Sequence, residues 1–94
     1  MREYETVLII DPNFKTENVE ETITKFTDLL KENKGRLGKI DKWGRRKLAY
    51  PISGHSDGFY VVIGFKGGDK TLKEIDRALK LTDEVIRFRT IRRD

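Results

Sequence analysis

Hydrophobic residues are grouped along the chain in ways that predict its first two elements. Tyr4–Ile10 is rich in β-branched and aliphatic residues and is closed by the turn-forming Asp11-Pro12-Asn13, which predicts a strand. The next apolar residues recur at intervals of three and four, the spacing of one face of a helix: Val19, Ile23, Phe26 and Leu30. This helix is predicted to begin near Thr16 and to end at Lys34-Gly35.

The middle of the chain favours extended structure. Leu37 and Ile40 are three residues apart, so a strict period of two is broken, and Gly38 between them can accommodate a β-bulge. We therefore expect a long, irregular strand over Arg36–Ile52. The Gly, Ser and Asp residues of the next segment, Ser53–Gly58, predict a loop.

A third strand and a second helix follow this loop. Phe59–Phe65, which reads FYVVIGF, predicts a strand that forms a hairpin with the one before it. Thr71, with Glu74 three residues later, fits a capping box at the start of a helix that ends near Leu81. The inward-facing residues of this helix are predicted to be Leu72, Ile75 and Leu79.

A last strand lies within EVIRFRTIRR, Glu84–Arg93, because apolar and cationic residues alternate there. The order of elements is then strand, helix, strand, strand, helix, strand. This order predicts an α+β, ferredoxin-like split βαβ fold (βαββαβ), a four-stranded antiparallel sheet with two helices on one face and the first and third strands central. At 94 residues, we expect one domain spanning 1–94.

The alternation of each strand assigns its residues to the two faces of the predicted sheet. The side that faces the helices should carry Leu8, Ile10, Phe59, Val61, Ile63, Phe65, Ile86 and Phe88. The other side should carry Glu3, Glu5, Val7, Ile9, Tyr60, Val62, Arg87, Arg89 and Ile91. This second face is apolar in the middle and charged at its edges, so it is either a surface for a protein partner or a face with ordinary exposed aliphatic residues. If a partner binds there, its contacts are Glu3, Glu5, Val7, Ile9, Tyr60, Val62 and Ile91.

Charge is unevenly distributed along the chain. The net charge is +4, and Lys34–Tyr50 holds seven basic residues against the single acid Asp41. Such a basic segment favours a polyanionic partner. The chain has no cysteine, no signal peptide and no apolar run of membrane-spanning length, so we expect a cytoplasmic protein without membrane contact.

Residues for catalysis or cofactor binding are not apparent in the sequence. His55 is the one histidine, in the predicted loop, where a solvated side chain is the better interpretation. The glycines of KGGDK have neither P-loop nor dinucleotide-binding spacing, and one histidine without cysteine provides no typical transition-metal site. We therefore expect no enzyme, no metal, no cofactor and no small-molecule substrate.

The segment KWGRRKLAYPI combines three consecutive cations with an indole. Arg45, Arg46 and Lys47 cannot all point to one side of a strand, which fits a strand that is wet on both faces. They could simply protect an edge strand from aggregation. That interpretation gives no role to Trp43, whose ring is suited to stack on a base while the arginines grip phosphates, so we favour nucleic-acid binding.

The chain resembles the bacterial small-subunit ribosomal protein six family over essentially its whole length. The features that carry the resemblance occur in the family's order: REYE, DPN, WGRRKLAYPI, GFY and LTDEVIRFRTIR. The resemblance implies a structural ribosomal protein that binds the central domain of small-subunit rRNA together with small-subunit ribosomal protein eighteen. It also implies that the basic strand meets rRNA, with Arg2 and Tyr4 beside it in preference to Arg92 or Arg93. The full set of RNA-contact candidates is Arg2, Tyr4, Trp43, Arg45, Arg46, Lys47, Arg87 and Arg89.

Two alternatives share the predicted topology. One is an RRM-like module that binds single-stranded RNA outside the ribosome, but Val7 and Ile9 stand where a base-stacking platform needs aromatic residues. The other is an enzyme or a small-molecule regulatory domain on this fold; acylphosphatases share the topology, but DPNFK after the first strand lacks their arginine-bearing phosphate loop. The residues favour an architectural role in which phosphate contacts supply affinity.

Overall fold

The computed structural model describes residues 1–12, 16–52 and 54–94, and the side chains of residues 16–18 are outside this description. The elements in chain order are β1 (Arg2–Ile10), α1 (Thr16–Glu32), β2 (Arg36–Ile52), β3 (His55–Gly67), α2 (Asp69–Lys80) and β4 (Val85–Arg92). All neighbouring strands pair antiparallel in the order β2-β3-β1-β4. The predicted ferredoxin-like fold, with β1 and β3 central, is therefore confirmed.

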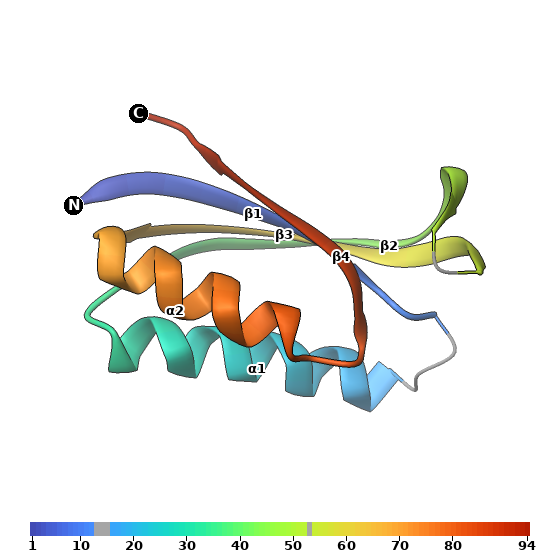
Figure 1. Ribbon diagram of the computed structural model, residues 1–94, viewed down its shortest axis with the longest axis horizontal. Coiled ribbons are helices and arrows are strands. Elements are labelled where there is room, and N and C mark those ends of the chain that lie inside the picture. Colours follow the sequence, from blue (N-terminus) through green and yellow to red (C-terminus); the bar gives the residue numbers. More distant parts are fainter. Residues whose placement is uncertain (13–15, 53) are drawn as a thin grey trace.

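Both helices pack on one face of the sheet, and the other face carries no helix (Figure 1). The core between the layers is formed by the apolar stripe of each helix and the helix-facing residues of the central strands, including Phe26, Leu30, Ile75, Leu8 and Ile63. The two chain ends lie at the same end of the molecule, opposite the tip of the β2–β3 hairpin (Figure 1). Within the described residues no helix is long and apolar enough to cross a membrane.

The predicted loop over Ser53–Gly58 is wrong for the residues that the structure describes, apart from Gly54. β3 begins at His55, which pairs with Ile52, so the hairpin turn is short; Ser53, like Asn13 of the predicted turn after β1, lies outside the described residues. His55 and Asp57 stay extended because each has a partner outside its own strand. His55 Nε2 lies 3.1 Å from Asp11 Oδ2, and Asp57 accepts a hydrogen bond from Arg45.

α2 begins two residues earlier than Thr71, the predicted N-cap. Gly68 occupies the N-cap position, and the Thr71 hydroxyl accepts the Gly68 N–H at 3.3 Å. The same hydroxyl donates to the Asn33 carbonyl at 2.8 Å, after the end of α1. Thr71 therefore connects the two helices instead of starting the second, because its buried hydroxyl finds both partners there.

β2 departs from regular pairing with β3 at three places. The first lies between Leu37 and Ile40, which confirms the predicted irregularity around Gly38. The second inserts Trp43 between Lys42 and Gly44. The third lies between Lys47 and Ile52, where residues 48–51 leave the ladder and curl away from the sheet at the hairpin end (Figure 1).

β4 has a similar irregularity, because Ile9 pairs with Arg87 while Ile10 pairs with Val85. The skipped residue is Ile86, which the alternation had assigned to the core. Val85 packs against the core in its place, together with Phe88. A bulge changes which residues face inward without any mark in the local sequence.

Candidate nucleic-acid and partner interfaces

We call Lys42–Lys47 of β2 the hairpin arm, because this segment pairs with β3 near the tip of the hairpin. Its cations point to both sides of the sheet. Arg45 pairs with Phe59 and Lys47 with Asp57, and both positions lie on the side of the sheet that faces the helices. Arg46 pairs with Gly58 on the opposite side, which carries no helix and is called the open side. The bulge at Trp43 sets this division because it advances β2 by one residue against β3.

Lys42 forms an ion pair with Glu20 of α1, and the three consecutive cations of the arm each have a different environment. Arg45 donates a hydrogen bond to Asp57 across the hairpin, and this contact raises the pKa of Arg45. Arg46 lies over the Trp43 ring, with its guanidinium carbon 5.4 Å from the ring centroid. Lys47 is exposed and has no acidic partner within the described part of the chain. The arm is thus fixed by Arg45, while Arg46 and Lys47 keep their charge available for phosphate.

Trp43 is half-exposed, at 46%, and its ring is engaged on the open side of the arm. It stacks on Tyr60, with centroids 6.2 Å apart and planes 9° apart. Its Nε1 donates to Asp41 Oδ2 at 3.2 Å. Gly44 beside it has φ of 86°, in the left-handed region that glycine adopts without strain. The indole therefore supports the arm and leaves only part of its surface for a nucleotide.

Arg2 and Tyr4 do not lie beside the arm, which corrects the sequence interpretation. Arg2 pairs with Gly67 whereas Arg45 pairs with Phe59, eight residues away on β3, or about 26 Å at ~3.3 Å per residue. Tyr4 is 6% exposed and its ring packs on Phe65 with centroids 5.5 Å apart. Because that ring belongs to the core, it offers no free face to a base.

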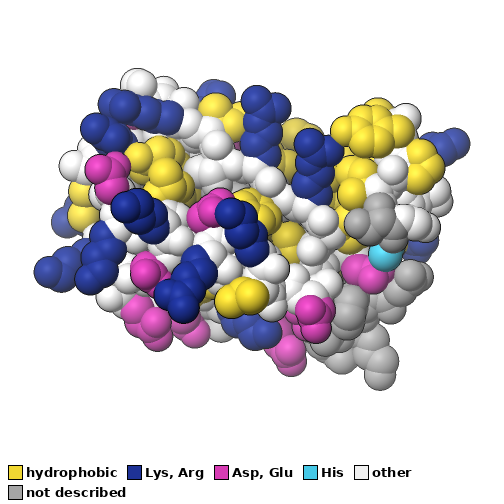
Figure 2. Space-filling view, viewed as in Figure 1, with side chains coloured by type: hydrophobic (Ala, Val, Ile, Leu, Met, Phe, Trp, Pro, Cys, Tyr) yellow, Lys and Arg dark blue, Asp and Glu magenta, His cyan; other side chains and the backbone are white. Residues whose placement is uncertain are grey.

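A second group of cations lies at the end of the molecule that carries both termini (Figure 1, Figure 2), where β1 begins at Arg2. Register brings Arg36 and Lys66 to this end, and Arg92 pairs with Tyr4. Several of these charges are already matched, since Arg2 lies 3.2 Å from Asp69 and Arg92 lies 3.0 Å from Asp94. The hydrogen bond from Arg92 lowers the pKa of Asp94. The basic residues are thus divided between two ends of the sheet.

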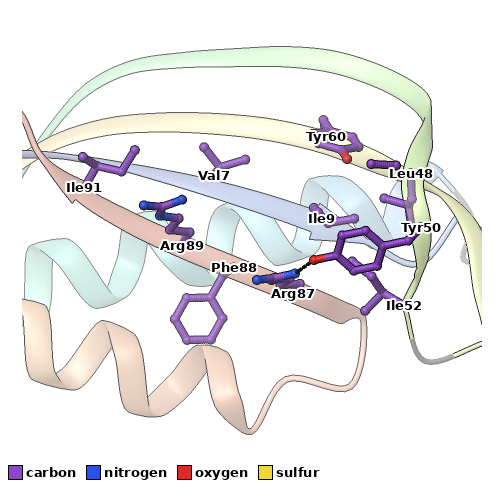
Figure 3. Close-up of a pocket in the computed structure, with 11 residues that line it drawn as sticks. Val7, Ile9, Leu48, Tyr50, Ile52, Tyr60, Arg87, Phe88, Arg89 and Ile91 are labelled. Atoms are coloured by element: carbon purple, nitrogen blue, oxygen red, sulfur yellow. Dashed lines mark hydrogen bonds between the residues drawn. The ribbon is translucent and has the colours of Figure 1, made fainter.

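The open face is the helix-free face of the sheet, and it is hollowed into a groove of about 320 Å³ (Figure 3). Its lining includes Val7, Ile9, Tyr60, Arg87, Arg89 and Ile91, as expected for this face, together with residues of the curled end of β2. Arg87 Nη1 donates to the Tyr50 hydroxyl at 2.9 Å, which joins the curl to β4 across the two central strands. Phe88 also borders the groove, but its ring points towards α2 (Figure 3).

The open face is less exposed than the absence of a helix implies. Ile9 and Val62 are buried by neighbouring side chains, whereas Val7 is half-buried and Ile91 remains 37% exposed. Glu3 and Glu5 share this face, as predicted from their alternation. Glu3 lies 3.6 Å from Lys66, and neither glutamate forms an ion pair with Arg87 or Arg89.

Sequence reasoning missed four residues that shape these surfaces: Asp41, Leu48, Tyr50 and Asp57. Asp57 was hidden by the loop assignment, and Leu48 and Tyr50 reach the open face only because β2 leaves its ladder. Pro51 was the available signal for that departure, since proline cannot donate to a ladder.

The described residues include no group of three or more His, Cys, Asp or Glu side chains that could hold a metal ion. His55 is half-buried against Asp11, and its Nδ1 has no hydrogen-bond partner. The contact between His55 Nε2 and Asp11 Oδ2 joins the start of β3 to the residue that follows β1.

Comparison with known proteins identifies the family. The family model described as Ribosomal protein S6 matches residues 3–92. The chain is 38% identical over 94 residues to the small ribosomal subunit protein bS6 of Heliobacterium modesticaldum, covering 100% of this chain and 98% of that one. It is 40% identical over 94 residues to its counterpart in Corynebacterium kroppenstedtii, covering 100% and 99%. The crystal structure of 30S ribosomal protein S6 from Thermotoga maritima superimposes with a TM-score of 0.92 at 35% identity, covering 98% of this chain and 87% of that chain. This chain therefore belongs to the ribosomal protein S6 family of the bacterial small ribosomal subunit.

Proposed function

We propose that this protein is a cytoplasmic, architectural constituent of the small subunit that binds the central domain of small-subunit rRNA together with ribosomal protein eighteen. Its family is one of structural ribosomal proteins and not of enzymes. The observation that carries the RNA-binding part is the hairpin arm, where Arg46 and Lys47 project from a scaffold fixed by Arg45–Asp57 and Trp43–Tyr60.

The arm fits a folded RNA backbone better than a single strand. Cations on both sides of one strand can contact phosphates across a junction or groove, which supplies affinity and position but little base reading. An RRM-like mode needs exposed aromatic rings on the central strands. Here the Tyr60 ring is stacked against Trp43, and the neighbouring positions of the open face on β1 and β3 are the aliphatic Val7 and Val62. Recognition is therefore by shape and phosphate position.

Replacing Arg45, Arg46 and Lys47 together by Ala tests the arm. Each phosphate contact releases about one counterion when the protein binds RNA. Without these contacts, the slope of log K against log salt for rRNA binding should become shallower by about two to three units. The matched control replaces the exposed helix residues Lys25, Lys31 and Lys73 by Ala, which removes the same charge elsewhere. Equal slopes for both triple variants would mean that net charge, and not the arm, governs binding.

The open face is the proposed docking site for ribosomal protein eighteen. It offers apolar side chains at its centre and charged ones at its rim, which is the composition of a protein interface. Val62 is only 8% exposed, so a polar residue there would disturb folding; Ile91 is the suitable position for a test.

Ile91→Gln should weaken binding to purified ribosomal protein eighteen by about tenfold, because an unpaired amide would be desolvated in the interface. Titration calorimetry measures the affinity. Leu81→Gln is the control, since Leu81 is 76% exposed just beyond the end of α2 and away from the open face. A wild-type affinity for Ile91→Gln would place the partner elsewhere on the molecule.

A further inference from the structure

The open face carries two opposite charges that have no partner within the described residues. Glu5 pairs in register with Ile91, and Val7, the next residue of β1 on this face, pairs with Arg89. Glu5 and Arg89 are therefore diagonal neighbours, close enough for long side chains to approach each other. They form no ion pair with each other or with any other described residue.

Arg87 continues the basic end of the same face. It pairs with Ile9, and its hydrogen bond goes to the neutral hydroxyl of Tyr50 and to no carboxylate. Along β1 the face therefore changes from acid to base: Glu5 lies level with Ile91, Arg89 lies level with Val7 two residues on, and Arg87 lies level with Ile9 two residues further. Four residues of β1 separate Glu5 from the Arg87 row, which is about 13 Å at ~3.3 Å per residue.

We propose that the open face selects its protein partner by the order of charges, which rests on the docking function proposed above. The partner segment presents a basic side chain to Glu5, an apolar side chain to the groove between Val7 and Ile91, and a carboxylate to Arg87 and Arg89. The Arg89 and Arg87 rows lie two and four residues of β1 beyond Glu5, so the base and the acid are about two to four residues apart in an extended segment and about four to nine apart in a helix.

The arrangement favours a carboxylate over an RNA phosphate at Arg89. A nucleic-acid backbone carries a negative charge at every nucleotide, so a strand crossing Arg87 and Arg89 would continue towards Glu5 and Glu3 and be repelled. A protein segment that carries both a basic and an acidic side chain can pair with Glu5 at one end of the face and with the arginines at the other. A carboxylate also matches the planar guanidinium with two parallel hydrogen bonds, which offsets the cost of desolvating Arg89 in an apolar groove.

The decisive experiment is the exchange variant Glu5→Lys/Arg89→Glu, which reverses the charge order and keeps the net charge unchanged. Two like-charge contacts replace two attractive ones, so its affinity for purified ribosomal protein eighteen should fall by about a hundredfold. Each single reversal should cost about tenfold. The matched exchange Glu21→Lys/Arg77→Glu alters exposed residues of the two helices and should bind within about twofold of wild type.

Thermal melting and the neutral variants Glu5→Gln and Arg89→Gln accompany the test. The neutral variants add no repulsion, so intermediate losses support the assignment even where a reversed variant folds poorly. If the exchange variant binds as wild type while Ile91→Gln is weakened, docking on this face stands and the charge order is overturned. If neither variant binds more weakly than the wild type, the partner does not dock on this face and the docking proposal itself is wrong.

Two further outcomes would assign the face to another occupant. A loss confined to rRNA binding, with partner affinity unchanged, would make Arg89 a phosphate contact. A self-associating wild-type protein in sedimentation experiments, dissociated by Arg89→Glu, would make a second copy of this chain the occupant. Either result overturns the proposed partner chemistry.

Discussion

Trp43 shows how one side chain can serve both stability and recognition. Its stack on Tyr60 and its contact with Arg46 fix the base of the arm, while nearly half of its surface is exposed. The identity of its neighbours explains why sequence alone left both roles open. Only the bulge at Trp43 and Gly44 brings the indole over Tyr60.

Trp43→Ala should lower the free energy of unfolding by about 1 kcal/mol, because an aromatic pair is lost. The affinity of the folded protein for rRNA should fall by about tenfold, since Arg46 loses its support and the exposed part of the ring is removed. Trp43→Phe keeps an aromatic ring on Tyr60 and should retain most of the stability. An unchanged rRNA affinity for Trp43→Ala, measured with melting curves alongside, would restrict the indole to packing.

Tyr4 shows that the period of two was more informative than the resemblance at that position. Leu8 and Ile10 were correctly assigned to the core, and the same alternation places Tyr4 on their side of β1. The RNA contact implied for Tyr4 by the resemblance stays a prediction, and the structure shows only that its ring is buried. Alternation is the better guide here because it follows directly from strand geometry.

At the scale of the elements, Gly44 is the residue that the arm requires. Its φ of 86° is strained for an L side chain, while a Cβ there would meet nothing within 4 Å. Gly44→Ala should therefore destabilise the protein by about 1–2 kcal/mol through backbone strain alone. Gly44→Asn should cost less, because asparagine tolerates the left-handed region. Chemical denaturation measures the free energy of unfolding of both variants and of the wild type. If Gly44→Ala were as stable as the wild type, the bulge would relax to accommodate the side chain.

The order and type of all six elements were predictable, because the helices have a strong apolar periodicity and the strands are rich in β-branched, aliphatic and aromatic residues, although β2 has no regular period. The start of β3 was not predictable, since its Ser, Asp and Gly residues resemble a loop, while the partners of His55 and Asp57 are Asp11 after β1 and Arg45 on β2. The inward side of β4 and the curl of β2 were also missed. Register shifts depend on the pairing strand, so a single sequence does not reveal them.

The whole molecule places its proposed RNA contacts at one end and its proposed protein contacts at the centre of the sheet, although Arg46 and Trp43 lie on the same side of the sheet as the open face. The arm belongs to the hairpin end, and the open face lies over the centre of the sheet. Ile91→Gln should therefore reduce rRNA recruitment only when ribosomal protein eighteen is present, because it removes no phosphate contact. Gel-shift titrations with and without the partner measure this difference. An equal loss in both titrations would show that Ile91 itself lies against RNA.

The hydrogen bond between Tyr50 and Arg87 has a mechanical consequence. β2 and β4 are the outer strands of an open sheet, and this contact joins them over the two strands between them. A load applied to the hairpin tip is therefore shared by β4 directly and is not passed only from strand to strand. We expect this contact, worth about 1 kcal/mol, to stiffen the hairpin end of the sheet.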